Sequence, residues 1–210
     1  MEFVFVVKRS DLFELSFPHG FVPRVAADPQ DRVATWTRRI RERGFFVERR
    51  WAEKDSSLKQ VIPYTLLVHR EELFLLKRLG KGGEARLHGK LSLGVGGHVN
   101  PVDLDGADVL DAGCRRELEE EVAIRAPYTL STVGVINDDS SDVGSVHFGL
   151  VNVARCETPD VAVRETDMLE GGFVARAALR EMARNERERF ETWSALIVDR
   201  LDEALAGAGA

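Results

Sequence analysis

The sequence predicts an α/β protein in which strands and helices are interspersed along one chain. Short runs rich in Val, Ile, Leu and Phe predict the strands, and apolar residues that recur every three or four positions predict the helices. At 210 residues the chain is long enough to bury one large core. We find no internal repeat, and we expect one domain over residues 1–210, with residues 1–55 as an N-terminal extension packed on it.

The composition excludes several classes of protein. The 44% hydrophobic and 30% charged residues are ordinary for a globular chain. A net charge of -6 argues against bulk nucleic acid as a partner, although a small nucleotide held through a metal ion is compatible with it. The N-terminus has no basic region and only a short apolar run, so we expect no signal peptide and no membrane segment. The two cysteines, Cys114 and Cys156, suit a reducing compartment; we expect a cytoplasmic protein and leave open whether it forms a homodimer.

The N-terminal extension predicts a strand and a helix. Residues 2–8 are rich in Val and Phe and predict the strand. Asp28 and Pro29 suit the N-cap and the first position of the helix, whose end is predicted at Gly44. The apolar face of this helix consists of Val33, Trp36 and Ile40. We expect the helix to pack on the domain without a role in chemistry.

Two strongly apolar runs follow, over residues 61–69 and 73–78. Because only three polar residues separate the runs, they predict a β-hairpin. Residues 45–51, which precede them, fit either a strand or irregular structure. The polar residues 53–57 predict a surface connection within the domain.

The loop over residues 79–90 is rich in glycine and basic residues and has two interpretations. Its Gly89-Lys90 pair does not belong to a P-loop, because that motif needs a glycine at position 84 and Ser or Thr at position 91. The simpler interpretation is a solvated loop. The functional interpretation is that a basic side chain of the loop reaches an anionic substrate. The candidates are Lys81, Arg86 and Lys90.

A predicted strand over residues 91–99 ends in a glycine cluster. Gly94, Gly96 and Gly97 permit unusual backbone angles and close approach of the backbone to a ligand. The dinucleotide-binding fingerprint needs a third glycine at the start of an immediately following helix, but the polar residues 100–105 intervene here. The glycines alone are therefore a weak signal.

Residues 106–124 predict an amphipathic helix with an acidic patch. Its apolar stripe, spaced every four residues, consists of Leu110, Cys114, Leu118 and Val122. Roughly opposite this stripe, Glu117, Glu120 and Glu121 share one helical turn through their i, i+3 and i+4 spacing. Like charges this close repel one another, so the patch predicts either full solvation or a bound cation. Glu119 alone is interpreted as a solvated charge.

The rest of the chain predicts three further strands and two helices. Residues 128–136 and 145–156 predict two strands joined by a polar turn, and residues 171–175 predict a short last strand. A short helix is predicted near residues 177–182. Residues 186–206 predict a single terminal helix that packs on the sheet. Its apolar face consists of Phe190, Trp193, Ile197 and Leu201.

The residues R-E-L-E-E-E-V-A-I at positions 116–124 resemble the second half of the Nudix box, G-x5-E-x7-R-E-U-x-E-E-x-G-U, in which U is aliphatic. In the box, seven residues lie between a glutamate and the arginine; Asp108 stands here in the place of that glutamate. Ten residues instead of five separate Gly97 from Asp108, so we expect a five-residue insertion. Ala123 replaces the last box glycine, which would cost ~1 kcal/mol at a left-handed helix end.

The resemblance extends, more narrowly, to a MutT-like group of predicted phosphoesterases. It depends on the stretch GVGGHV, the chain length and the residues E-T-W-S at 191–194. The family resemblance implies a Nudix-type α/β/α sandwich with a mixed sheet and an N-terminal elaboration, a box region over residues 97–124 and a C-terminal helix over residues 186–206. It implies a hydrolase in which a metal-activated water attacks a diphosphate linkage.

The resemblance also assigns roles to residues. Glu117, Glu120 and Glu121 would bind Mg²⁺ or Mn²⁺, hard cations that prefer oxygen ligands. Arg116 would position Glu117, and the catalytic set would be Glu117, Glu120 and Arg116. The remaining assignments are Gly96, Gly97 and His98 for contacts with the substrate phosphates and Asp108 for support from the first helical turn.

Three questions stay open at the level of single residues. His98 is as compatible with a substrate contact as with an ordinary strand end, whereas His147 fits best as a partly buried histidine whose hydrogen bonds are satisfied. Nudix enzymes often use a further acid from beyond the box. The candidates for that distal acid are Asp139, Asp142 and Glu165.

The function we expect is divalent-metal-dependent hydrolysis of a nucleoside diphosphate linked to another moiety. One alternative is a hydrolase or isomerase that acts on a non-nucleotide, prenyl-type diphosphate, whose site would be lined by apolar groups. Another is a Nudix domain that binds a nucleotide or a partner as a sensor without turnover. A purely structural role would leave the glycine turn and the glutamate patch unexplained.

Overall fold

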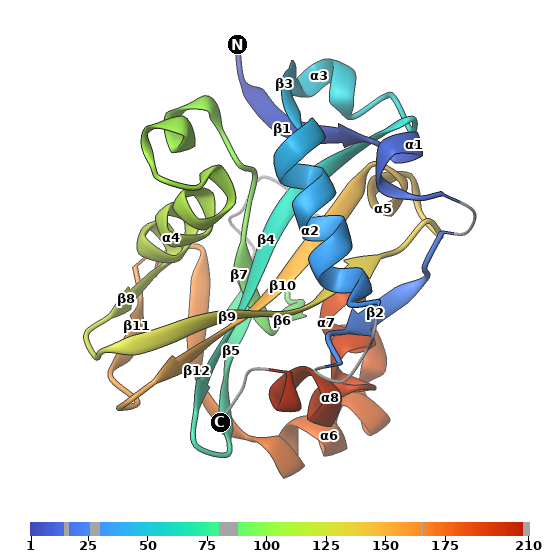
Figure 1. The fold of residues 1–210 in the computed structure, drawn as a ribbon. Helices are drawn as coiled ribbons and strands as arrows, with labels where there is room; N and C mark the ends of the chain where they lie inside the picture. The colour runs from blue at the N-terminus through green and yellow to red at the C-terminus, as the bar shows by residue number, and fades with distance from the viewer. Residues whose placement is uncertain (15–16, 26–29, 80–87, 165, 208–210) are drawn as a thin grey trace.

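The structure, a computed structural model, describes residues 1–14, 17–25, 30–79, 88–164 and 166–207 (Figure 1). The strands are β1 Phe3–Lys8, β2 Gly20–Pro23, β3 Phe45–Glu48, β4 Leu58–His69, β5 Glu72–Arg78, β6 Leu91–Ser92, β7 Gly94–Gly96, β8 Val122–Ile124, β9 Tyr128–Asn137, β10 His147–Cys156, β11 Val161–Val163 and β12 Leu169–Ala175. The helices are α1 Arg9–Leu12, α2 Arg32–Arg43, α3 Arg49–Ala52, η2 Pro101–Asp105, α4 Val109–Glu121, α5 Asp142–Ser145, α6 Arg176–Asn185, η3 Arg187–Arg189, α7 Thr192–Val198 and α8 Leu201–Ala206.

A mixed ten-stranded sheet runs through the molecule in the order β12-β5-β4-β10-β9-β2, with β1, β3, β6 and β7 joined to this path. The central pair, β4 and β10, is parallel, and the other pairings are antiparallel. The antiparallel pairing of β4 with β5 confirms the predicted hairpin. A separate two-stranded sheet pairs β8 with β11.

Helices cover both faces of the main sheet, which explains why β4 is buried along its whole length. On one face, α2 packs through Trp36 and Ile40, and α4 packs through Cys114 and Leu118. On the other face, helices α6, α7 and α8 pack around Tyr64 and other residues of β4 (Figure 1). The predicted α/β/α sandwich is confirmed.

The N-terminal extension adds strands to the sheet and a helix to one face. Strand β1 pairs with β4 and β3, and β2 pairs with β9. Helix α2 begins at Arg32 behind the N-cap Asp31, whose carboxylate accepts a hydrogen bond from the Ala34 N–H. The predicted start was therefore too early; Asp28 and Pro29 lie outside the described residues. The predicted end at Gly44 is confirmed.

Helix α4 is shorter than the predicted segment 106–124. It begins after the N-cap Asp108 and ends at Glu121, and Val122 has an extended backbone (φ -132°, ψ 150°) and starts β8. Val122 is buried as expected, but it lies on a strand. Ala123 pairs with Ala162 in that strand, so no left-handed backbone is needed and the expected cost of replacing glycine does not arise.

The predicted single helix over residues 186–206 is wrong, because the segment is divided among η3, α7 and α8. Phe190 is extended (φ -80°, ψ 144°) and forms a bridge with Leu91, so α7 starts only at Thr192. A second break at Arg200 separates α7 from α8. The predicted apolar residues of this segment nevertheless lie in or against the core. In the part of the chain that the structure describes, no helix is both long enough and apolar enough to cross a membrane.

Candidate active site

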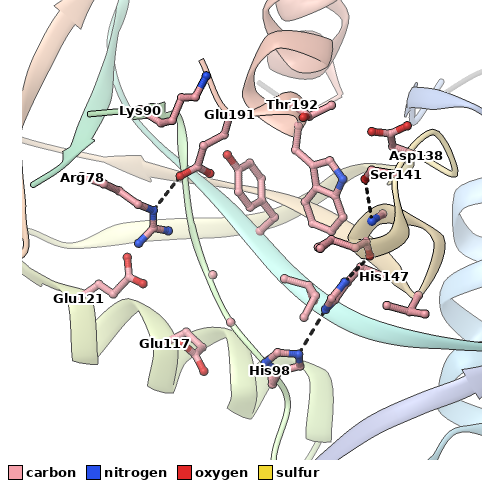
Figure 2. Close-up of a pocket in the computed structure, with 18 of the residues that line it drawn as sticks. Arg78, Lys90, His98, Glu117, Glu121, Asp138, Ser141, His147, Glu191 and Thr192 are labelled. Carbon is pink, nitrogen blue, oxygen red and sulfur yellow. Dashed lines mark hydrogen bonds and ion pairs between the residues drawn. The ribbon is translucent and has the colours of Figure 1, made fainter. Parts of the chain in front are cut away.

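A cavity of about 1000 Å³ lies between α4 and the start of α7. Helix α4 contributes Glu117 and Glu121 to its lining, and the segment before and at the start of α7 contributes Glu191 and Thr192 (Figure 2). The glycine turn of β7, the connection between β9 and β10, and the N-terminal extension, through Arg49, complete the lining. The cavity is therefore large enough for a substrate of nucleotide size.

The glycine turn and the box helix meet at Glu117. A side chain at Gly97 would place its Cβ 2.3 Å from Glu117 Oε2, so only glycine leaves room for this carboxylate against the backbone. A Cβ at Gly96 would lie 2.0 Å from the Pro63 carbonyl oxygen, which explains glycine at that position too. The two glycines and Glu117, which the sequence singled out separately, thus form one compact arrangement.

Arg116 holds that arrangement together through a set of hydrogen bonds. Its Nη1 donates to Glu117 Oε1 at 2.7 Å, and its Nη2 donates to the His98 carbonyl at 2.7 Å. Its Nε and Nη2 donate to the two Asp103 oxygens at 2.9 and 3.1 Å. The bond to Asp103 is the main cause that raises the pKa of Arg116, against the effect of burial. Arg116 is thus fixed as a cation that orients Glu117, consistent with the predicted positioning role.

Asp103 was missed by the sequence analysis. It is nearly fully buried and forms an ion pair with Arg116. Asp103 follows Gly97 by the separation that the box gives to its acidic residue, so counting forward from the glycine would have found it. The five extra residues lie between Asp103 and Arg116.

Asp108, the predicted box acid, has a different environment. Its carboxylate accepts hydrogen bonds from the N–H groups of Leu110 and Asp111 and pairs with Arg41 at 2.5 Å. Asp108 is not among the residues that line the cavity. It supports α4 as its N-cap, while Asp103 makes the contact with Arg116.

The three predicted metal ligands differ in exposure. The Glu117 side chain is 13% exposed, and burial raises its pKa against the opposing effect of Arg116. Glu121 also lines the cavity, whereas Glu120 is 56% exposed and pairs with Arg116 at 3.2 Å. Among the described residues, no three acids, histidines or cysteines converge closely enough to form a preformed metal cluster. Glu117 and Glu121 are the two carboxylates of the set that line the cavity.

The opposite wall was largely unpredicted. Arg78, from the end of β5, donates to Glu191 Oε1 at 2.7 Å and lies between Glu191 and Glu121 (Figure 2). Burial opposes the charge of Arg78, but Glu191 and then Glu121 outweigh this effect and raise its pKa. Ser194 accepts a hydrogen bond from the Leu93 N–H at 2.9 Å and lies 2.8 Å from the Tyr64 hydroxyl. The residues 191–194, noted in the sequence only for their resemblance, thus form one side of the cavity.

Two histidines of the cavity lining lie next to each other. His147 Nδ1 donates to the Val143 carbonyl at 2.6 Å, and its Nε2 lies 3.4 Å from His98 Nε2. His98 is also bonded to Gln60 at 2.9 Å. Burial lowers the pKa of His98 to about 3 and lowers that of His147, so both rings are neutral near pH 7. His147 is partly buried with its hydrogen bonds satisfied, as predicted, and both histidines line the cavity.

The candidates for the distal acid differ in whether they line the cavity. Asp139 forms ion pairs with Arg9 and, at 2.6 Å, with the fully buried Lys59; together these cations outweigh burial and lower the pKa of Asp139 to about 2. Asp139 is not among the residues that line the cavity, whereas Asp142 and Asp138 are. Glu165 lies outside the described residues. Of the loop cations, Lys90 lines the cavity, and Lys81 and Arg86 lie outside the described residues.

Comparisons with known proteins agree with this fold. The chain is 35% identical over 209 residues to Protein YmaB from Bacillus subtilis (strain 168), a match that covers 96% of this chain and 98% of YmaB. It is 31% identical to Tm1382, whose crystal structure is described as that of a Nudix hydrolase, with a TM-score of 0.74 over 95% of this chain and 98% of Tm1382.

A more distant structure shows the fold alone. The Nudix domain of Shewanella oneidensis NrtR, in complex with ADP ribose, is 12% identical with a TM-score of 0.53, over 70% of this chain and 88% of that domain. A search against models of known protein families gives no match.

The Nudix fold, the box residues and the similarity to Tm1382 along nearly the whole chain define the class of this protein. The chain belongs to the Nudix superfamily and is a Nudix hydrolase.

Proposed function

We propose that the protein hydrolyses, with a divalent cation, the diphosphate linkage of a nucleoside diphosphate joined to another moiety. The observation that carries this proposal is the Glu117 carboxylate, which is packed on the Gly97 backbone, held by Arg116 and turned to a cavity of about 1000 Å³. We further propose that residues 1–210 form one domain.

The residues of the site fit a divalent cation. Carboxylate oxygens are hard ligands of the kind that Mg²⁺ and Mn²⁺ prefer, and Mg²⁺ commonly uses only one or two carboxylates together with waters and substrate phosphates. Glu117 and Glu121 line the cavity, and Glu120 adjoins them through Arg116. When bound there, the cation would activate water for attack on phosphorus and neutralise the leaving phosphate.

The protein's own residues would supply orientation. Arg116, fixed by Asp103, would keep Glu117 in one position, which matters because small displacements of reacting groups are costly. Gly96 and Gly97 would let the substrate phosphates approach the backbone. We propose Asp142 as the distal acid, because it lines the cavity, whereas Asp139 forms an ion pair with Lys59.

The cavity lining favours a nucleotide over a prenyl diphosphate. Charged side chains, among them Arg78, Arg49 and Asp138, line the space beside apolar ones such as Met168 and Phe190. A hydrocarbon tail would displace water from these groups without offering them a hydrogen bond, at a cost in free energy. The buried, unpaired thiols of Cys114 and Cys156 support a reducing, cytoplasmic setting.

The test is a phosphate-release screen with Mg²⁺ or Mn²⁺ over nucleoside triphosphates, dinucleoside polyphosphates, nucleotide sugars, ADP-ribose and prenyl diphosphates. We expect turnover of nucleotides with a second moiety, and its loss in the presence of a chelator. Turnover of prenyl diphosphates alone would overturn the substrate class. Nucleotide binding with no turnover under any metal condition would favour the sensor.

A further inference from the structure

We propose that the base of the nucleoside binds in this cavity against the indole ring of Trp193, and that the Asp138 carboxylate accepts hydrogen bonds from N–H groups of that base. The inference rests on the proposed function, because it assigns the non-phosphate part of the same substrate. It concerns the wall of the cavity that faces α4, outside the Nudix box.

The Trp193 ring is held in one orientation by its neighbours. It meets the Tyr64 ring edge to face, with centroids 5.6 Å apart and planes at 85°. A Cβ at Gly149 would lie 2.8 Å from Trp193 Cζ3, so the absence of a side chain at Gly149 makes room for the six-membered ring. The next residue, Ser194, is fixed by its contacts with Tyr64 and Leu93. A ring constrained in this way is a preorganised surface for stacking, which limits the entropy lost on binding.

The ring is also available to a ligand. Trp193 is only partly buried, although it packs against the core, and it lines the cavity. Its indole N–H has no hydrogen-bond partner among the described residues. Aromatic rings in nucleotide sites stack on any base through its π face, and Trp offers the largest such surface.

Asp138 gives this end of the cavity a hydrogen-bond acceptor. The residue is 2% exposed, and its Oδ1 accepts a hydrogen bond from the Ser140 N–H at 3.0 Å. His19 Nδ1 lies 3.8 Å from the same oxygen, and the described residues include no hydrogen-bond donor to Oδ2. Figure 2 shows Asp138 and Thr192, the neighbour of Trp193 in the chain, at the same end of the cavity.

Together the two residues match a nucleobase better than a hydrocarbon chain. Asp138 lines the cavity, so an Oδ2 atom without a protein donor can accept a hydrogen bond from a ligand there. The amino group of adenine, guanine or cytosine can donate that hydrogen bond, and the flat ring that carries it would lie on the indole. A prenyl chain would contact the indole but leave the carboxylate unsatisfied.

The first test observes binding without turnover. The probe is α,β-methylene-ADP, whose bridging carbon prevents hydrolysis, added with Mg²⁺ to the full-length protein. The indole N–H signals of Trp36, Trp51 and Trp193 are followed by NMR, and the Trp193 signal is assigned from Trp193→Phe. We expect the Trp193 signal to shift on titration while the signals of the buried Trp36 and the exposed Trp51, neither of which lines the cavity, stay in place. A saturating titration in which the Trp193 signal does not move overturns the proposal.

The second test measures affinity in variants. We expect Trp193→Ala to weaken binding of α,β-methylene-ADP by roughly 10- to 100-fold and to change binding of inorganic pyrophosphate by less than about 3-fold. Trp193→Phe, which keeps an aromatic face, should retain most of the affinity, and Trp51→Ala is the matched control. Asp138→Asn should weaken binding on the order of 10-fold. Affinities for the nucleotide that stay at the wild-type value in both Trp193→Ala and Asp138→Asn overturn the proposal.

The outcomes of these tests distinguish the proposed base site from the proposed reaction. If the wild type shows no metal-dependent hydrolysis but the Trp193 signal shifts, the base site stands and the proposed reaction fails. If hydrolysis of nucleotides occurs and depends on Glu117, while Trp193→Ala leaves kcat/KM unchanged, the reaction stands and the base site fails.

Discussion

The two walls of the cavity are built in different ways. The wall that carries Glu117 comes from one continuous stretch, residues 96–121, in which the glycine turn, Asp103 and α4 follow one another in the chain. The opposite wall combines the end of β5, the connection between β9 and β10, and the start of α7, which are far apart in sequence. The first wall carries the residues proposed to act on the diphosphate. The second wall carries the residues proposed to bind the base of the substrate. We therefore expect substitutions in the first wall to affect the reaction itself and substitutions in the second wall to affect which substrate binds.

The largest expected effect comes from removing the charge of Glu117. Glu117→Gln keeps the shape that fits against Gly97 but loses an oxygen proposed to bind the metal ion and the charge that pairs with Arg116. We expect kcat/KM to fall on the order of 10³-fold, since a catalytic cation supplies several kcal/mol to the transition state. Steady-state hydrolysis at saturating Mg²⁺ measures this, with Glu119→Gln on the exposed face of α4 as the control. Rates within threefold of wild type would remove Glu117 from the chemistry.

The next effect tests the close approach of the glycine turn. Gly97→Ala would bring a methyl group to 2.3 Å from Glu117 Oε2, so the carboxylate must move. We expect kcat to fall about 10²-fold, the effect of a displacement of about 1 Å near reacting groups. Gly172→Ala in β12 is the matched control, because a Cβ there meets nothing within 4 Å. Equal activities for the two variants would show that the turn does not position Glu117.

A smaller effect distinguishes Asp103 from Asp108 as the acidic residue of the Nudix box. Asp103→Asn weakens the support of Arg116, and we expect kcat/KM to fall about 10-fold. Asp108→Asn keeps an N-cap but loses the ion pair with Arg41, so we expect unchanged activity and a loss of at most about 1 kcal/mol in the free energy of unfolding. Parallel kinetics and urea unfolding measure both quantities. The reverse pattern would restore Asp108 as the box acid.

The smallest effect concerns the contact between the two walls at His98 and His147. Burial lowers the pKa of His98 to about 3 and lowers that of His147 below its usual value of 6.5. A lowered pKa in a base means that it binds its proton only at lower pH, so His98 stays neutral between pH 8 and pH 6.5 and His147 gains less charge over that range than a free imidazole. We expect kcat to change less than about twofold over that range from these groups. NMR titration of the imidazole protons checks the assignment, and a ring that titrates near pH 7 would contradict it.

The wall of contiguous residues was predictable because its chemistry depends on spacing within a helix and a turn. Glu117, Glu121, Arg116 and the two glycines came from their order in the sequence, and so did the hairpin, whereas the α/β/α sandwich came from the family resemblance. Glu120, predicted with the other two glutamates, is not among the residues that line the cavity. The sequence analysis missed Asp103 because it located the acidic residue of the box by counting back from Arg116. The buried ion pair between Asp103 and Arg116 indicates that the five-residue insertion follows Asp103, so this acid is found by counting forward from Gly97.

The opposite wall was not predictable because its residues are brought together by tertiary contacts. Tyr64 and Arg78 lie on strands whose apolar pattern indicates only burial, and their contacts with Ser194 and Glu191 depend on how α7 packs. The same contacts explain the wrong prediction of one terminal helix. The periodicity of the segment is helical, but the bridge between Phe190 and Leu91 holds the backbone extended at that point.

The most direct test of the two-wall account is a crystal structure with Mn²⁺ and α,β-methylene-ADP, in which anomalous scattering locates the metal. The account predicts Mn²⁺ bound by the Glu117 carboxylate, with Glu121 on the same side of the ion, and the adenine ring against Trp193. A metal ion bound away from Glu117, for example between Asp138 and Asp142, would contradict it.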